Sequence, residues 1–99
     1  MANIPYYEQK DIENIKKLRE MMKELPPFCT EFFRGIEPRT STRTRIAYAY
    51  DLSVFFDFLK KENPVFSKME LMDFTLDHLD QITVTDLEEY MEYLKYRFN

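Results

Sequence analysis

The sequence predicts an all-α fold, a single domain of helices that pack around one core. Apolar residues recur at the three- and four-residue spacing of a helix face along most of the chain. Glycine occurs once, as Gly35, whereas sandwiches and barrels need turn glycines repeatedly. The five prolines fall between the apolar-periodic stretches, where they begin or end helices. A length of 99 residues and a hydrophobic content of 44% fit a single folded domain.

The first two helices are predicted on either side of a proline pair. Over residues 7–25, one stripe is apolar and the other faces are charged; the stripe consists of Ile12, Ile15, Leu18 and Met22. Pro26 and Pro27 end this helix. A second helix is predicted over residues 27–35, with Gly35 as its C-terminal cap. Its apolar face consists of Phe28, Phe32 and Phe33.

The longest helix is predicted over residues 42–62, with Ser41 or Thr42 as its N-cap. At 1.5 Å per residue it spans roughly 30 Å. We expect its core stripe to be Tyr48, Leu52, Phe55 and Leu59. Its C-terminal half is apolar on most sides because three more residues widen the stripe: Val54, Phe56 and Phe58. Such a helix is expected at the centre of a bundle, covered by several neighbours.

The remainder of the chain is predicted to form short turns and one further helix. Between residues 65 and 83 we expect short helical turns and loop, with four residues in the core: Phe74, Leu76, Leu79 and Ile82. The last helix is predicted to start near Thr85, where Thr85 and Glu88 have the spacing of a capping box. Its apolar face consists of Leu87, Tyr90, Met91, Leu94 and Phe98. The helix reaches the end of the sequence without a terminal cap, which favours a piece of a longer protein.

The residue types that carry most enzyme chemistry are scarce, so we expect no catalytic residue, no metal and no cofactor. His78 and Cys29 are single, and no Cys/His cluster exists to hold zinc. One glycine excludes a phosphate-cradling glycine-rich loop. Cys29 is expected to be a small buried hydrophobe, and a free thiol fits a reducing cytoplasm. No apolar run is long enough to cross a membrane, and no signal peptide is visible.

The chemically distinctive stretch lies before the longest helix. Residues 34–45 contain four arginines against Glu37, a charge of +3, which leaves −7 on the other residues because the total is −4. A helix N-terminus attracts anions, and arginines and short hydroxyls add donors suited to phosphate. The arginines cannot all reach one phosphate, which favours a surface that spans a DNA groove. The alternative is that these residues only decorate a loop and an N-cap. The candidate DNA contacts are Arg39, Ser41, Thr42, Arg43, Thr44 and Arg45.

Three motifs give the chain a resemblance to a known family. The first is Thr44-x-x-x-Tyr48-x-x-Asp51-Leu52-x-x-Phe55-x-x-Phe58-Leu59. It is similar to the signature helix of the tyrosine recombinases, or phage integrases, in their N-terminal SAM-like, core-binding domain. Residues 82–94, Ile82-Thr83-x-x-Asp86-Leu87-x-x-Tyr90-Met91-x-x-Leu94, resemble the closing helix of that domain. Phe28-x-x-x-Phe32-Phe33 resembles its opening helix, so the resemblance covers about residues 26–97.

The resemblance implies a small orthogonal bundle of about four to five helices that packs against duplex DNA during integration or recombination of a mobile element, in the bacterial cytoplasm. It divides the chain into an N-terminal amphipathic helix, residues 1–25, and a core-binding domain, residues 26–99. In the family a second domain carries the catalytic Arg, His-x-x-Arg and Tyr, and none of that pattern is present here. The expected partners are double-stranded DNA, the chain's own C-terminal catalytic domain and other recombinase subunits, with no membrane. The alternative is a helical protein–protein interaction module without a DNA role, which the charge of −4 and the aromatic-rich helices favour.

Overall fold

The computed structural model of the chain describes residues 5–98, with the side chain of Phe98 outside the described part. Its elements are α1 (Tyr6–Met22), α2 (Phe28–Ile36), the 3₁₀ turn η1 (Glu37–Arg39), α3 (Thr42–Glu62), the 3₁₀ turn η2 (Leu71–Asp73), α4 (Leu76–Leu79) and α5 (Val84–Phe98). Over these residues there is no strand. The predicted all-α class and small helical bundle are therefore confirmed.

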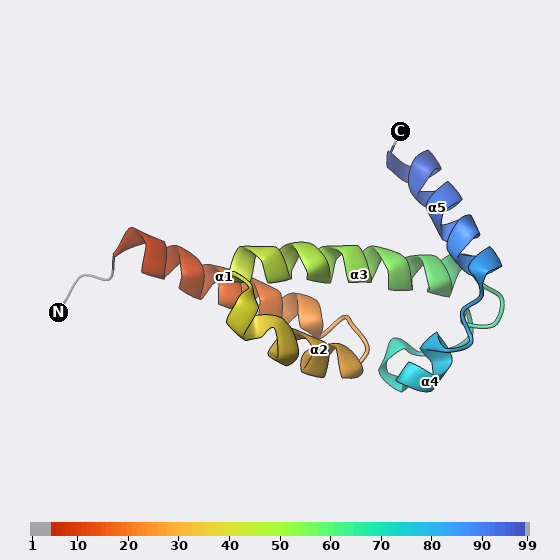
Figure 1. Cartoon of the computed structure of the whole chain (residues 1–99), viewed down its shortest axis with the longest axis horizontal. Coiled ribbons are helices and arrows are strands. Elements are labelled where there is room, and N and C mark those ends of the chain that lie inside the picture. The colour runs from red at the N-terminus through yellow and green to blue at the C-terminus, as the bar shows by residue number, and fades with distance from the viewer. Residues whose placement is uncertain (1–4, 99) are drawn as a thin grey trace.

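Helices α1 and α3 lie side by side and run in the same direction, and α2 runs back between their ends (Figure 1). Helix α5 begins close to the C-terminal end of α3 and runs at a steep angle to it (Figure 1). The radius of gyration is 16.2 Å, compared with about 13 Å for a compact domain of this length. The molecule measures 55 × 31 × 23 Å, because the first turns of α1 and much of α5 extend beyond the core.

The core lies where α1, α2 and α3 meet. Its buried members come from every part of this layer: Leu18, Leu25, Cys29, Phe33, Ala49, Phe56 and Leu59. Along α3 the buried positions on this side are separated by three, four, seven and three residues, the spacing of one helix face: Thr42, Arg45, Ala49, Phe56 and Leu59. The predicted core position of Tyr48 is wrong, because its side chain is 43% exposed. The other three predicted positions are confirmed, because Leu59 is buried and Leu52 and Phe55 pack against the core. The apolar pattern did not include Thr42 and Arg45, because these two buried residues are polar.

The C-terminal half of α3 has a second covered face, which packs against α5. The rings of Phe55 and Phe58 lie 4.9 and 5.2 Å from that of Tyr90, and Phe58 also lies 5.1 Å from Tyr93. An ion pair of 3.5 Å joins Asp57 and Arg97 next to this aromatic cluster. The prediction that this half of α3 is apolar on most sides is confirmed.

The segment between α3 and α5 consists of short turns, as predicted. Phe74 is buried and its ring lies 5.2 Å from Phe56 and 5.1 Å from Phe66. Leu79 and Ile82 pack against the core, but the predicted burial of Leu76 is wrong, because it is exposed.

The helix caps agree with the sequence at one end of α3 and differ elsewhere. The backbone N–H of Thr44 donates to Ser41 Oγ at 3.2 Å, so the predicted N-cap is confirmed. The predicted cap at Gly35 is wrong, because α2 continues through it to Ile36 and no glycine has a positive φ in the described chain.

The predicted cap of the last helix is also displaced. The backbone N–H of Asp86 donates to Thr83 Oγ1 at 3.1 Å, and the backbone N–H of Thr83 donates to Asp86 Oδ2 at 2.9 Å. This reciprocal pair is a capping box that begins two residues before Thr85. On the helix that follows, Leu87 and Met91 are exposed, so the predicted apolar face is only partly covered.

Burial raises the pKa of the Cys29 thiol from 9.0 to about 11. We expect a thiol-reactive disulfide reagent at pH 8 to modify Cys29 only as fast as the protein unfolds, and at once in urea. Because the unfolded thiol ionises near 9.0 and the folded one near 11, the free energy of unfolding should fall as pH rises through this window, by up to about 2.7 kcal/mol. Urea titrations of the protein and of Cys29→Ala, which lacks this term, measure the difference. Rapid labelling of the native protein would contradict the burial.

Candidate nucleic-acid interface

The α2–α3 junction, residues 34–45, is held by the guanidinium of Arg45. Its Nη1 donates to the carbonyl oxygens of Thr40 and Glu37 at 2.7 and 3.1 Å and to Thr40 Oγ1 at 3.1 Å. Its Nη2 donates to Thr42 Oγ1 at 3.1 Å, and Thr40 Oγ1 donates to the carbonyl of Ile36 at 2.7 Å. One side chain thus connects the end of α2, the 3₁₀ turn and the start of α3. The Thr40 carbonyl, beyond the end of the 3₁₀ turn, is satisfied by Arg45, whereas the Glu37 carbonyl also accepts from the backbone N–H of Thr40 at 3.4 Å.

Arg45 is a buried cation without a carboxylate partner in the described chain. Its residue is 8% exposed, and no Asp or Glu oxygen lies within 4.0 Å of its nitrogens. Buried charges are normally paired, because removing an ion from water is costly. Here carbonyl and hydroxyl oxygens replace part of the lost hydration.

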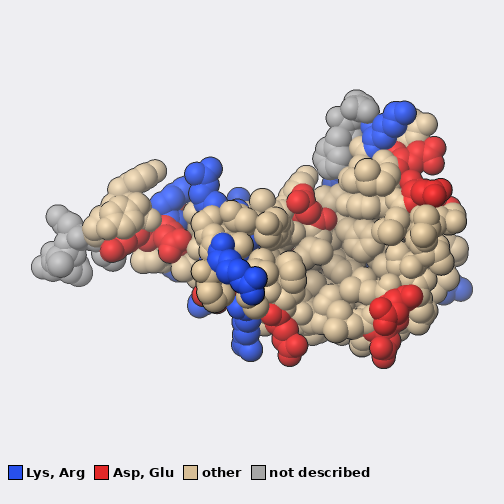
Figure 2. All heavy atoms as spheres, in the orientation of Figure 1, with Lys and Arg blue, Asp and Glu red and all other residues tan. Residues whose placement is uncertain are grey.

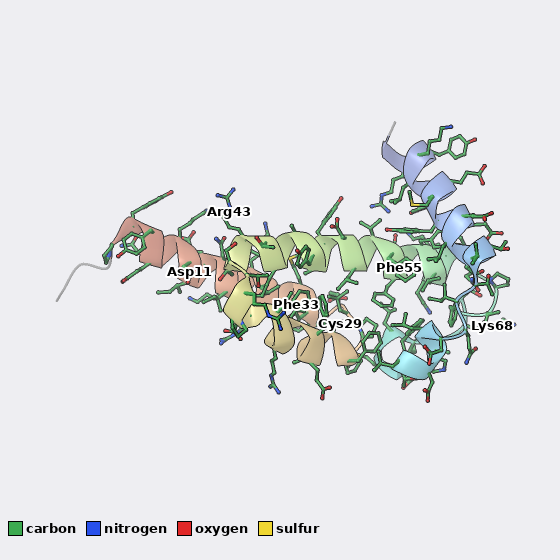
Figure 3. All side chains as sticks on the ribbon, viewed as in Figure 1. Asp11, Cys29, Phe33, Arg43, Phe55 and Lys68 are labelled. Atoms are coloured by element: carbon green, nitrogen blue, oxygen red, sulfur yellow. The ribbon has the colours of Figure 1, made fainter. Side chains whose placement is uncertain are left out.

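The structure separates the sequence-predicted site residues into two groups. Arg39, Ser41 and Arg43 are exposed, and Thr44 is half-buried. Figure 3 shows Arg43 pointing away from α2 and outward from the start of α3. Thr42 and Arg45 are instead buried and bonded to each other. The six candidates therefore share one junction, but they do not form one exposed patch.

Arg34 adds an exposed guanidinium to this junction, although it was not among the candidate contacts. It lies in the last turn of α2. The junction cations, Arg34, Arg39 and Arg43, come from three consecutive elements. None of their guanidinium groups has a hydrogen bond or ion pair with the residues that the structure describes. The charge window that contains Arg34 is the sequence signal that could have included it.

The charge of the chain is divided along its length. Residues 1–45 carry nine Lys and Arg against seven Asp and Glu, a net +2, whereas residues 46–99 carry five against eleven, a net −6. Figure 2 shows Lys and Arg mainly over the end that holds α1 and α2, and Asp and Glu mainly over the end that holds α4 and α5. A polyanion is therefore attracted to one end of the molecule and repelled by the other.

The described residues contain neither a cluster of metal-binding side chains nor a helix that could cross a membrane. No group of three or more His, Cys, Asp or Glu is placed to hold a metal ion over residues 5–98. Within the same range, no helix has the length and apolar character needed to cross a membrane.

Replacing the central guanidinium tests how the junction is held. We expect Arg45→Met to lower the free energy of unfolding by about 1–3 kcal/mol, because the part-buried carbonyl of Thr40 and the hydroxyl of Thr42 lose the donor that Arg45 provides. The matched variant Arg43→Met removes an exposed, unpaired guanidinium from the same helix and should change stability by less than about 0.5 kcal/mol. Urea denaturation followed by circular dichroism compares the two. Equal stability of Arg45→Met and the unsubstituted protein would show that the junction does not depend on these bonds.

The chain is similar in sequence to tyrosine recombinases. It is 33% identical over 78 residues to tyrosine recombinase XerC of Caldanaerobacter subterraneus subsp. tengcongensis, a match that covers 70% of this chain and 22% of that protein. It is 26% identical over 95 residues to tyrosine recombinase XerS of Lactococcus lactis subsp. cremoris, covering 87% of this chain and 23% of that protein. No protein-family model matches the chain, and no solved structure matches it. The chain therefore contains a recombinase-related region, and it spans about a quarter of the length of the curated relatives it matches.

Proposed function

We propose that this chain is the DNA-binding, non-catalytic domain of a tyrosine recombinase of the phage integrase family. In this proposal it has the SAM-like, core-binding role and holds duplex DNA during integration or recombination of a mobile element, in the bacterial cytoplasm. The observation that carries the proposal is the set of junction cations. Three exposed guanidinium groups without internal partners lie on consecutive elements of a chain that is similar to recombinases.

Exposed arginines without ion-pair partners are suited to phosphate, because no internal bond has to be broken when they bind it. We propose Arg39 and Arg43 as the principal contacts, with Arg34, Ser41 and Thr44 beside them. Thr42 and Arg45 take a different role in the proposal. Their side chains are buried, so they hold the junction in place and do not themselves reach the DNA.

Residues 46–99, which we call the acidic end, restrict where DNA can lie on the domain. Residues 46–99 carry a net −6, so the DNA is expected to cross the junction and to avoid α4 and the first turns of α5. The same charge weakens binding by this domain alone. The remaining affinity and the strand-cutting step are assigned to a C-terminal catalytic domain, and other recombinase subunits are proposed as further partners.

The predicted division of the chain at residues 25 and 26 stays a prediction. Leu18 of α1 and Leu25 after it belong to the same buried cluster as Phe33 and Phe56. Any boundary here therefore separates two roles and not two independent cores.

Removing the principal contacts tests the proposal. We expect Arg39→Gln/Arg43→Gln to raise the Kd for duplex DNA about tenfold or more at low salt, and to flatten the slope of log K against log salt by about two units, one for each lost phosphate contact. Fluorescence anisotropy with a labelled duplex measures both. The matched control Lys68→Gln/Lys95→Gln removes the same charge from exposed positions of the acidic end and should keep the slope. Equal slopes for the two double variants would contradict the proposed contacts.

A specific observation favours the protein–protein interaction module as a second candidate. The side chains of Val84, Leu87 and Met91 are exposed at successive turns of α5, so this helix has an uncovered apolar stripe. NMR titration with duplex DNA at low salt separates the candidates. Shifts concentrated at residues 34–45 support DNA binding, and their absence at any salt concentration favours the interaction module.

A further inference from the structure

A groove between α3 and α5 gathers carboxylates and aromatic rings at the acidic end of the molecule. Its volume is about 330 Å³, and it is open to solvent along one side. We call it the acidic groove, and six residues line it: Phe58, Glu62, Glu89, Glu92, Tyr93 and Tyr96. Its wall thus consists of three carboxylates and three rings.

The carboxylates of the acidic groove have no cation beside them in the described chain. None of the three glutamates forms a hydrogen bond or an ion pair with the residues that the structure describes. Glu89 and Glu92 are three residues apart on α5, where like charges repel each other. Glu62 lines the same groove from the end of α3. A cation that entered the groove would relieve this repulsion.

The rings of the groove favour a guanidinium over an ammonium group. A guanidinium is planar, so it stacks on aromatic faces while it pairs with carboxylates. The guanidinium carbon of Arg97 already lies 5.9 Å from the centre of the Tyr93 ring. Tyr96 is 74% exposed, so its ring is accessible to a further guanidinium.

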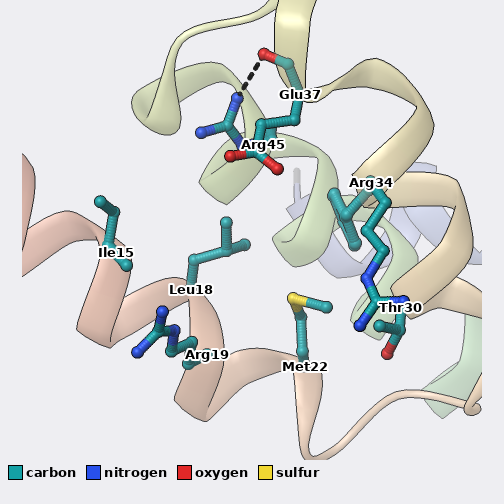
Figure 4. Close-up of a pocket in the computed structure, with 9 residues that line it drawn as sticks. Ile15, Leu18, Arg19, Met22, Thr30, Arg34, Glu37 and Arg45 are labelled. Atoms are coloured by element: carbon teal, nitrogen blue, oxygen red, sulfur yellow. Dashed lines mark hydrogen bonds between the residues drawn. The ribbon is translucent and has the colours of Figure 1, made fainter.

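Exposed guanidinium groups of this kind occur at the junction of the same chain. Arg34, Arg39 and Arg43 form no ion pair with the residues that the structure describes. Figure 4 shows that the guanidinium of Arg34 points away from Glu37, the acidic residue of the junction. The junction and the acidic groove lie at opposite ends of α3, which spans about 30 Å. The groove therefore cannot reach the junction of its own chain, but it can reach that of a second copy.

We propose that the acidic groove of one copy binds the junction cations of a second copy. Glu89 and Glu92 of one copy pair with Arg39 and Arg43 of the other, and the ring of Tyr96 packs against one of these guanidinium groups. Each copy presents one groove and one junction, so the copies associate head to tail.

The association gives the junction a competitor for DNA. Exposed ion pairs are weak and sensitive to salt, whereas duplex DNA has a high density of charge. We therefore expect DNA to displace the second copy from the junction. This consequence rests on the proposed function, but the association itself does not.

Sedimentation equilibrium of the whole chain measures the association. We expect a Kd on the order of 100 µM at about 20 mM salt, and at least about tenfold weaker association at about 300 mM salt. Glu89→Gln/Glu92→Gln should raise the Kd at least about fivefold. The matched control Asp77→Asn/Asp80→Asn removes the same charge from exposed positions outside the groove and should leave the Kd unchanged.

Mixing two variants tests whether the groove meets the junction. Glu89→Gln/Glu92→Gln retains the junction, and Arg39→Gln/Arg43→Gln, which should also raise the Kd at least about fivefold, retains the groove. An equimolar mixture contains one intact surface of each kind, so it should associate more tightly than either variant alone. A folding defect or a general attraction between charged molecules would not be relieved by mixing. Circular dichroism establishes that both variants remain folded.

Three results would overturn the proposal: a monomer at about 1 mM protein and about 20 mM salt, unchanged association in either variant, or no gain on mixing. A monomer would assign the acidic groove to a basic partner other than a second copy. The DNA-binding function is tested separately, because Glu89→Gln/Glu92→Gln leaves the junction intact and should keep DNA binding. Association restored by mixing, without any binding of DNA, would support this proposal and contradict only the proposed function.

Discussion

The architecture of this chain depends on how one buried guanidinium satisfies its surroundings. Arg45 donates to the carbonyls of Glu37 and Thr40 and to the hydroxyl of Thr42, which fixes the turn between α2 and α3. That turn sets the direction in which α3 leaves α2. Helix α1 packs along α3, and α5 packs against the C-terminal half of α3. The positions of α1 and α5 relative to α2 therefore depend on this turn. A cation in this position is costly to bury, which means that its bonds constrain the junction to one geometry.

Helix α3 also connects two chemically different ends. Its N-terminal half lies beside exposed arginines, and its C-terminal half is surrounded by aromatic rings and followed by an acidic segment. The same helix therefore joins a basic surface to the apolar support of α5. The total charge of −4 describes neither end, because the distribution of charge and not its sum determines where a polyanion approaches.

Local patterns predicted the elements well, and tertiary contacts account for the differences. The bounds of α3 and its cap at Ser41 follow from short-range chemistry, so the sequence predicts both correctly. Tyr48 was misplaced because hydrogen bonds to the turn just before α3 make the polar residue Arg45 a core residue, and an apolar pattern does not include it. The position of the candidate site was predictable from its charge, but the separation of buried Arg45 from exposed Arg43 was not.

The attachment of α5 has a mechanical consequence. This 15-residue helix contacts α3 at two places along its length. Tyr90 and Tyr93, in its middle, pack against Phe55 and Phe58. Arg97, in its last turn, forms the ion pair with Asp57. Helix α5 is therefore braced against α3 at both points, and it would swing away only if the rings repacked and the ion pair broke together.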